Sequence, residues 1–413
     1  MPPTPALHAG DRPSDTTPGP SPLDWAAHRL ERTRSQGLER RPRLREGGSD
    51  IHSTVDGRRV VVFSGNDYLG LAVHPAVIRA AADAALALGV GSSGSRHLSG
   101  CHAEIGLLEE EAASFLRCGA ATLAPSGHAA NLAILGALGG RDAVIFSDER
   151  NHASIVDGCR LSRSRVEVYR HRDLDDLGHR LGTADGRPII VSDTVFSVDG
   201  TCADVRGLRR LAEHHGAWLV LDEAHAVGTV GDDGRGAALA AGIDGADPTL
   251  VRIVTLSKAL GASGAVICGA PEVRRLLLQQ GRALIYSTAL PHPIVAAARA
   301  AFLVLRTEPQ RVAALQSRSV RLHSRLLALD PGGQAPLPVI TVPISDPWRA
   351  LEVEARLLDA GYLAQAVRPP TVPLGETRIR LCVSAAHTDA EIDGVAGALT
   401  GILAAPERTG TTP

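Results

Sequence analysis

The stretch Arg252-Ile253-Val254-Thr255-Leu256-Ser257-Lys258-Ala259-Leu260-Gly261 predicts an apolar strand that runs into a turn of small and hydroxyl-bearing residues. A second stretch, Trp218-Leu219-Val220-Leu221-Asp222-Glu223-Ala224-His225, also places polar residues directly after an apolar strand. Ligands of open α/β sheets bind beyond the carboxyl ends of the strands. Both stretches are therefore expected to end at a ligand site.

Outward from these stretches, short apolar runs alternate with amphipathic helix patterns between about residues 60 and 300. Continuous apolar strands between helices are typical of a mostly parallel sheet covered on both faces, so the expected class is α/β. Beyond residue 300, a long helix pattern leads into further short strands and helices, which indicate a small α+β domain. The expected strands are 121–124, 143–147, 166–169, 188–193, 218–222, 252–256, 265–268, 339–342, 363–367 and 378–383, and the expected helices include 24–41, 104–117, 129–138, 204–215 and 348–360.

Composition divides the chain into five segments. Seven prolines among Thr, Ser, Asp and Gly predict a disordered tail at the start, and a second flexible tail is expected at the end. An arginine-rich helical arm follows the first tail. The expected segments are the tail 1–22, the arm 23–59, the large domain 60–300, the small domain 301–405 and the tail 406–413.

Charge and hydropathy exclude several classes of protein. The 413 residues are 44% apolar and carry a formal net charge of −2, which gives no sign of a nucleic-acid or membrane-surface partner. No apolar run reaches the roughly 18 residues of a membrane span, and the segment Met1-Pro2-Pro3-Thr4-Pro5 lacks the pattern of a secretory signal. Six cysteines without zinc spacing predict a cytoplasmic location and no metal site.

Lysine usage singles out one residue. Of the 43 Lys and Arg residues, Lys258 is the only lysine. On a surface the two residue types are nearly equivalent, but only lysine can lose its proton and form a Schiff base. The alternative is that Lys258 remains by chance in a sequence that otherwise uses arginine and has no special role. The position of Lys258 at the end of an apolar strand favours a Schiff-base lysine.

Asp222 stands at the carboxyl end of the neighbouring apolar strand. A buried carboxylate needs a cationic partner, and a protonated pyridine nitrogen is such a partner. The alternative is an aspartate that caps the next helix. With Lys258 at the end of another strand, the sequence favours the cofactor interpretation.

Two further strand-to-helix turns carry small and polar residues. Residues 125–131 (Pro-Ser-Gly-His-Ala-Ala-Asn) predict a helix N-terminus whose amides could meet a phosphate, although an ordinary cap looks the same. Residues 147–154 leave His152 at the rim of the sheet. By contrast, Gly89-Val90-Gly91-Ser92-Ser93-Gly94 matches a dinucleotide motif but follows a helix pattern, so we interpret it as a flexible loop on the substrate side.

Taken in order, these motifs resemble the α-oxoamine synthases, pyridoxal-phosphate (PLP) enzymes of fold type I, from about residue 24 to 404. The resemblance implies a PLP-binding large domain, a small C-terminal α+β domain, and a homodimer with shared active sites. It rests on residues 64–71 (Ser-Gly-Asn-Asp-Tyr-Leu-Gly-Leu), 91–100, 151–154, 195–200, 222–225 and 257–258.

The resemblance also implies roles for single residues. Lys258 would bind PLP as a Schiff base and then act as the base. Asp222 would pair with the pyridine nitrogen, His152 would stack on the ring, and Ser197 and His225 would contact the phenolic oxygen. The implied binding residues are Gly127, His128 and Thr255 for the cofactor, Ser287 and Thr288 for the partner subunit's phosphate, Arg368 with Thr371 beside it for the amino-acid carboxylate, and Asn66 and Arg40 as further substrate-binding residues.

Within the family, residues 284–288 and 367–373 (Val-Arg-Pro-Pro-Thr-Val-Pro) are similar to one branch. That branch condenses L-alanine with pimeloyl-CoA, or with a pimeloyl-carrier protein, in biotin biosynthesis. Another branch using glycine, serine or a different acyl chain stays open, as do a transaminase or lyase of the same fold and a silent cofactor-binding module. An NAD oxidoreductase would rest only on residues 89–94.

The chain departs from the family pattern at three places. His128 stands where many relatives have an aromatic residue, and Arg96 where some have glycine. Relatives place an acyl-binding arginine directly after a leucine, whereas Leu38 is followed here by Glu39 and only then by Arg40 and Arg41. The arginine that serves the acyl substrate is therefore open.

Overall fold

The structure is a computed structural model that describes residues 21–344 and 346–405. The tail expected at 1–22 lies almost entirely outside the described residues, and the tail at 406–413 lies entirely outside them. The chain divides into two compact units, Met1–Pro42 and Arg43–Pro413. In the first unit, helix α1 (Pro22–Ser35) begins with a capping box between Ser21 and Asp24. It ends before Gly37, which makes it shorter than the expected helix 24–41.

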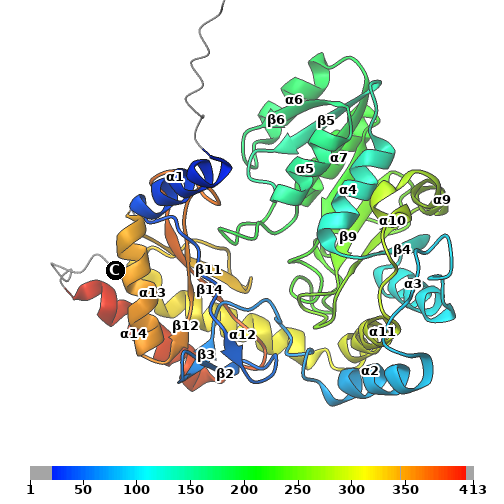
Figure 1. Cartoon of the computed structure of the whole chain (residues 1–413). Helices are drawn as coiled ribbons and strands as arrows, with labels where there is room; N and C mark the ends of the chain where they lie inside the picture. Colours follow the sequence, from blue (N-terminus) through cyan, green and yellow to red (C-terminus); the bar gives the residue numbers. More distant parts are fainter. Residues whose placement is uncertain (1–20, 345, 406–413) are drawn as a thin grey trace, which may run out of the picture. The chain divides into compact units, whose positions relative to one another are not determined.

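A seven-stranded sheet forms the centre of the second unit (Figure 1). Its order is β4-β10-β9-β8-β7-β5-β6, and the five strands from β9 to β6 are parallel, whereas β10 runs antiparallel to both of its neighbours. This confirms the expected α/β class with a mostly parallel sheet. The strands are β4 (Ala120–Ala124), β5 (Ala143–Asp148), β6 (Arg165–Tyr169), β7 (Arg187–Asp193), β8 (Trp218–Asp222), β9 (Leu250–Thr255) and β10 (Ala265–Gly269).

Helices cover both faces of this sheet because alternate strand residues join different apolar clusters. Val220 belongs to the cluster with α4 and α5, whereas Leu219 and Leu221 belong to the cluster with α6 and α7. The continuous apolar strands of the sequence therefore follow from burial on two sides. The helices are α3 (Ala103–Leu116), α4 (Gly127–Leu138), α5 (Ala153–Leu161), α6 (Leu174–Thr183), α7 (Val205–His215), α8 (Ala237–Ala240), α9 (Pro271–Gln280) and α10 (Arg282–Ile285).

The C-terminal part contains two smaller sheets. One has the order β11-β14-β13, with β11 (Val339–Pro343), β14 (Arg378–Cys382) and β13 (Gln365–Val367). The other has the order β1-β2-β3-β12, with β1 (Arg45–Glu46), β2 (His52–Val55), β3 (Arg58–Val62) and β12 (Tyr362–Leu363). Helices α12 (Gln310–Arg325) and α13 (Pro347–Asp359) pack against these sheets, and α14 (Asp389–Ala404) packs against both of these helices. Helix α11 (His292–Thr307) packs instead against α2 (Pro75–Leu88) and α3.

The boundary expected at residue 60 does not match the strand pairing. Strand β3 pairs in parallel with β12, so Val61 lies opposite Tyr362, and Figure 1 draws β2 and β3 in blue beside the C-terminal strands. The segment 45–62, expected to belong mostly to a helical arm, is therefore a part of the C-terminal sheet. The long helix pattern beyond residue 300 is also two helices, because Pro309 interrupts it between α11 and α12.

No helix among residues 21–344 and 346–405 combines the length and the apolar character needed to cross a membrane.

Candidate active site

The carboxyl ends of the parallel strands bring the predicted site residues together. Asp222 ends β8, Thr255 ends β9, and Asp193 ends β7 opposite Asp222 in the strand register. Lys258 lies three residues beyond the end of β9. Because parallel strands end at one edge of the sheet, these side chains lie at the same edge, and Asp193 joins them although the sequence alone does not predict it.

Lys258 is held by His225. The Nζ atom of Lys258 lies 2.8 Å from Nε2 of His225, and Nδ1 of His225 lies 2.6 Å from the hydroxyl oxygen of Tyr68. Burial lowers the pKa of Lys258, although the negative charge of Asp222 opposes this effect. Burial, and then the charge of Lys258, hold the pKa of His225 well below its usual value. Both pKa shifts move these groups toward their uncharged forms.

Asp222 is a buried carboxylate, 4% exposed, whose contacts are hydrogen bonds. Oδ2 accepts from Nδ2 of Asn131 at 2.7 Å, and Oδ1 accepts from the amide of Ala224 at 2.9 Å. Within the described ranges no arginine, lysine or histidine forms a salt bridge with it. A buried carboxylate without a cationic partner fits a ligand that carries positive charge into the site.

Asp193 and His152 lie beside this carboxylate. Burial, and then the charge of Asp222, raise the pKa of Asp193 well above its usual value. Oδ2 of Asp193 accepts a hydrogen bond from the backbone amide of His152 at 2.7 Å. The ring of His152 caps α5, with Nδ1 at 2.7 Å from Oγ of Ser154, and its side chain is exposed at the rim. This position leaves one face of the imidazole available to a ligand.

The N-terminus of α4 meets the end of β9. The hydroxyl group of Ser126 accepts from the amide of Ala129 at 3.1 Å and caps the helix. A Cβ atom on Gly127 would lie 2.5 Å from Cγ2 of Thr255, so this close approach requires glycine. His128 is exposed at the same turn. The amides at the start of α4 form a site for a phosphate group, while the hydroxyl group of Thr255 donates to the carbonyl oxygen of Ala224 at 3.3 Å.

These features together fit PLP. Lys258 offers the amine, Asp222 offers an anion for the pyridine nitrogen, and the α4 N-terminus offers donors for the phosphate. The fit rests on the chemistry of the groups present at this edge of the sheet.

Asn66, Tyr68 and Arg380 lie behind the lysine. Oδ1 of Asn66 lies 3.1 Å from the Tyr68 hydroxyl oxygen and accepts a hydrogen bond from Nη2 of Arg380 at 3.2 Å. Arg380 also donates from Nε to the carbonyl oxygen of Ser197 at 2.8 Å, so its guanidinium joins two predicted site residues. We did not predict Tyr68 or Arg380 as site residues. The available signal was an arginine at an inward position of the strand 378–383, where it is 8% exposed.

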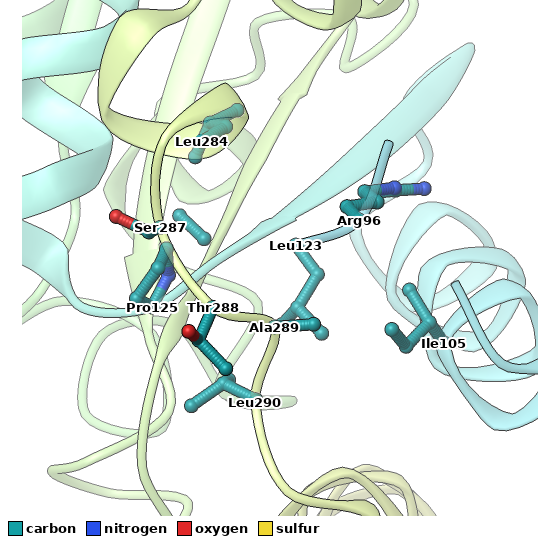
Figure 2. A pocket seen from close by; sticks show the side chains of 10 residues that line it. Arg96, Ile105, Leu123, Pro125, Leu284, Ser287, Thr288, Ala289 and Leu290 are labelled. Carbon is teal, nitrogen blue, oxygen red and sulfur yellow. The ribbon is translucent and has the colours of Figure 1, made fainter. Parts of the chain in front are cut away.

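Ser287 and Thr288 line a small cavity with Arg96 and Pro125 (Figure 2). Thr288 pairs with Ser95 in an isolated bridge, and the amide of Ala289 donates to the carbonyl of Gly94 at 2.9 Å. The loop around Gly94 is thus tied to the 287–290 segment. Arg96 forms an ion pair with the buried carboxylate of Glu109.

Arg368 and Thr371 lie in the loop after β13, where the amide of Thr371 donates to the carbonyl of Arg368 at 3.1 Å. Arg150, two residues before His152, connects this loop to the large sheet. Its guanidinium lies 3.5 Å from Glu376 and 3.1 Å from Asp199, which follows Ser197. Arg40 belongs to the first compact unit, which is described by itself.

A cavity of about 230 Å³ lies next to the turn that carries Lys258. Asn66, Ser257 and Gly261 line it, together with Arg45 of β1. It offers room for a second substrate next to the Lys258 turn.

Comparisons with known proteins identify what the chain is similar to. Residues 58–399 match the family "Aminotransferase class I and II". An 8-amino-7-oxononanoate synthase from Anaeromyxobacter dehalogenans is 42% identical over 395 residues, covering 94% of this chain and 99% of that protein. The protein of the same name from Marinobacter nauticus is 40% identical, covering 90% and 95%.

Two solved structures extend the comparison. A variant of serine palmitoyltransferase from S. paucimobilis with a bound PLP–myriocin aldimine superposes with a TM-score of 0.86 at 28% identity, covering 92% of this chain and 97% of that one. An 8-amino-7-oxononanoate synthase from Francisella tularensis superposes with a TM-score of 0.72 at 27% identity, covering 83% and 98%.

Proposed function

Because the chain belongs to the aminotransferase class I and II family and, within it, to the 8-amino-7-oxononanoate synthase family, we propose that it condenses L-alanine with pimeloyl-CoA or a pimeloyl-carrier protein. The products are 8-amino-7-oxononanoate, the free thiol and CO₂, in a step of biotin biosynthesis. The observation that carries this proposal is the single lysine, hydrogen-bonded to His225 near the buried carboxylate of Asp222, with which no residue in the described part of the chain forms a salt bridge. We also propose a cytoplasmic homodimer whose subunits share their active sites through Ser287 and Thr288.

The proposed roles follow from the chemistry of each group. When bound, PLP supplies an electron sink for the negative charge that develops at Cα of the amino acid. Lys258 binds the cofactor, and its neutral amine removes the Cα proton. Asp222 stabilises positive charge on the ring nitrogen, while Ser197 and His225 serve the phenolic oxygen. The remaining cofactor contacts come from Gly127, His128, His152 and Thr255.

Substrate recognition falls to residues nearer the surface. Arg368, with Thr371 and Asn66, binds the carboxylate of alanine and so orients the bonds at Cα. That carboxylate leaves as CO₂, so the carboxylate that remains in the product belongs to the acyl chain. The acyl chain therefore carries a negative charge at its far end, and a cation is needed to receive it.

Two arginines are candidates for this cation, Arg40 of the first unit and Arg45 of the cavity wall. Arg45 lines the cavity, and its Nε and Nη2 atoms donate to Ser53 Oγ at 3.1 Å and to the carbonyl oxygen of Asp50 at 3.0 Å. Loss of the serving arginine is expected to raise KM for pimeloyl-CoA about tenfold or more, without affecting an acyl-CoA that has no terminal carboxylate. Arg40→Ala and Arg45→Ala, assayed with both thioesters, identify which arginine serves. Equal losses on both thioesters would contradict a carboxylate role.

The first experiment is thiol release by purified, PLP-loaded protein. Release that requires both L-alanine and pimeloyl-CoA supports the proposal. Pimeloyl-carrier protein is assayed in parallel, because the carrier is part of what the proposal leaves open. Silence with both thioesters, despite a bound cofactor, would reject the proposal.

A second candidate is another condensing enzyme of the same family. The structural similarity to a serine palmitoyltransferase, with a TM-score of 0.86, supports this second candidate function. Serine or glycine replacing alanine, with palmitoyl-CoA or acetyl-CoA, tests it in the same assay. Release with one of these pairs, and not with alanine and pimeloyl-CoA, would move the chain to that branch.

A further inference from the structure

A row of hydrogen bonds runs from Lys258 into the protein interior. His225 contacts Lys258 Nζ through Nε2 at 2.8 Å and the Tyr68 hydroxyl through Nδ1 at 2.6 Å. The same hydroxyl group reaches Oδ1 of Asn66 at 3.1 Å. Tyr68 is fully buried and His225 is 4% exposed. Bulk water therefore does not compete for these positions.

The Tyr68 hydroxyl group can donate its proton to one of two acceptors, Nδ1 of His225 or Oδ1 of Asn66. Oδ1 of Asn66 already accepts from the charged guanidinium of Arg380 at 3.2 Å. The only hydrogen bond to Nδ1 of His225 from the described residues is the one with Tyr68. Because the Tyr68 oxygen lies 2.6 Å from Nδ1 of His225 but 3.1 Å from Oδ1 of Asn66, the contact with His225 is the stronger hydrogen bond and the Tyr68 proton belongs on the His225 side. A neutral imidazole has one proton, so His225 then carries it on Nε2.

We propose that Tyr68 is a positioning residue that sets the tautomer of His225, so that Nε2–H faces Lys258 and holds its side chain as the free amine. A neutral amine has a lone pair that accepts this hydrogen bond, whereas an ammonium group has none. The inference rests on the proposed function for the use of that amine as a base. The hydrogen bonds themselves require neither cofactor nor substrate.

The opposite arrangement explains why the tyrosine is needed. If Tyr68 donated to Asn66, Nδ1–H of His225 would donate to the Tyr68 oxygen, and Nε2 would accept from a protonated Lys258. This arrangement is disfavoured because the Tyr68–Asn66 distance of 3.1 Å is longer than the roughly 2.7–2.8 Å that is usual for O–H···O hydrogen bonds. The short contact between Tyr68 and His225 thus favours the arrangement with the free amine.

Other charged and titratable groups also act on Lys258, and removing one hydroxyl group from Tyr68 leaves them all in place. The carboxylates favour the ammonium form, and the cation favours the amine. These groups are Asp222 on β8, Asp193 on β7, His152 at the start of α5, and Arg380 and Cys382 on β14.

The single lysine makes a direct test possible. In cofactor-free, full-length protein, competitive labelling with acetic anhydride across pH reports the titration midpoint of Lys258, because no other lysine yields a labelled side chain. We expect Tyr68→Phe to raise this midpoint by about one pH unit, the roughly tenfold change that one ordinary hydrogen bond supports. Tyr169→Phe is the matched control, since Tyr169 is an equally buried phenol in another apolar cluster, and its midpoint should not move.

A second variant is expected to shift the titration midpoint of Lys258 in the opposite direction while it keeps nearly the same side-chain shape. 3-Fluorotyrosine at position 68 is a stronger hydrogen-bond donor and should lower the midpoint, which keeps the test valid if Tyr68→Phe does not fold. Equal midpoints in the fluorinated and unmodified proteins would overturn the proposal. A failed condensation assay would not change this measurement, because no cofactor or substrate takes part in it.

Discussion

The two regions that carry the proposed site residues are built differently. At the edge of the large sheet, Asp222 and His225 are buried, and hydrogen bonds of 2.6–2.9 Å hold their side chains. In the loop after β13, Thr371 is exposed, and the half-exposed Arg150 connects the loop to the large sheet. Burial lets a protein set protonation states, whereas an exposed loop adapts to different ligands. We therefore expect the sheet edge to determine the reaction and the loop to determine the substrate.

The largest effect is expected at the sheet edge, from Lys258→Ala. No other primary amine side chain exists in the chain, so turnover should fall below detection while the fold persists. Thiol release measures turnover, the absorbance of the cofactor measures its binding, and thermal unfolding measures whether the fold persists. Lys258→Arg is the control, because it keeps the positive charge without the ability to form a Schiff base. Condensation by Lys258→Ala at the wild-type rate would refute the central assignment.

Asp222→Asn should have the next largest effect. If the carboxylate forms a buried ion pair with the ring nitrogen, its loss costs about 3–5 kcal/mol. If the transition state is destabilised by this full free energy, the rate falls by roughly a hundred- to several-thousand-fold. Single-turnover kinetics at saturating alanine measure it. A loss below about tenfold would mean that Asp222 serves the fold more than the reaction.

Glu223, the adjacent residue, sharpens the contrast between chemistry and stability. It forms a completely buried ion pair with Arg252. Its Oε1 atom also accepts a hydrogen bond from the backbone amide of Ala238 at 2.8 Å. Glu223→Gln should lower the free energy of unfolding by about 3–5 kcal/mol, since it leaves the guanidinium without its counter-charge. Urea unfolding measures this, and Arg275→Gln, which breaks an exposed pair with Glu272, is the control with little expected change. Equal effects of the two variants would contradict the argument.

The smallest effect is expected from Arg150→Ala, which releases the loop from the sheet edge. Because Arg150 is half exposed, solvent weakens its pairs with Asp199 and Glu376, and KM for alanine should rise only a few-fold with little change in kcat. Arg160→Ala on the nearby helix α5 removes an exposed arginine without that bridge and serves as control. A drop in kcat as large as that of Asp222→Asn would show that the two regions are not separate.

The strands of the large sheet were predictable because their signal is local. The predicted strand 218–222 coincides with β8, and the other strands of this sheet are found within two residues of their predicted ends. Each is an apolar run buried on both faces, bounded by polar turns. The pairing of β3 with β12 was not predictable, because it joins short segments from opposite ends of the chain.

The sequence by itself determined the chemistry that this protein can perform. A guanidinium group cannot replace a primary amine in forming a Schiff base. The single lysine after an apolar strand therefore identifies the reactive group before the tertiary structure is known. Only the tertiary structure decided which groups stand behind that amine. Tyr68 meets His225 across 157 residues, and Arg380 meets Asn66 across 314 residues. Hydrogen bonds between such distant residues leave no periodic pattern in the sequence, because their geometry exists only once the strands are packed together.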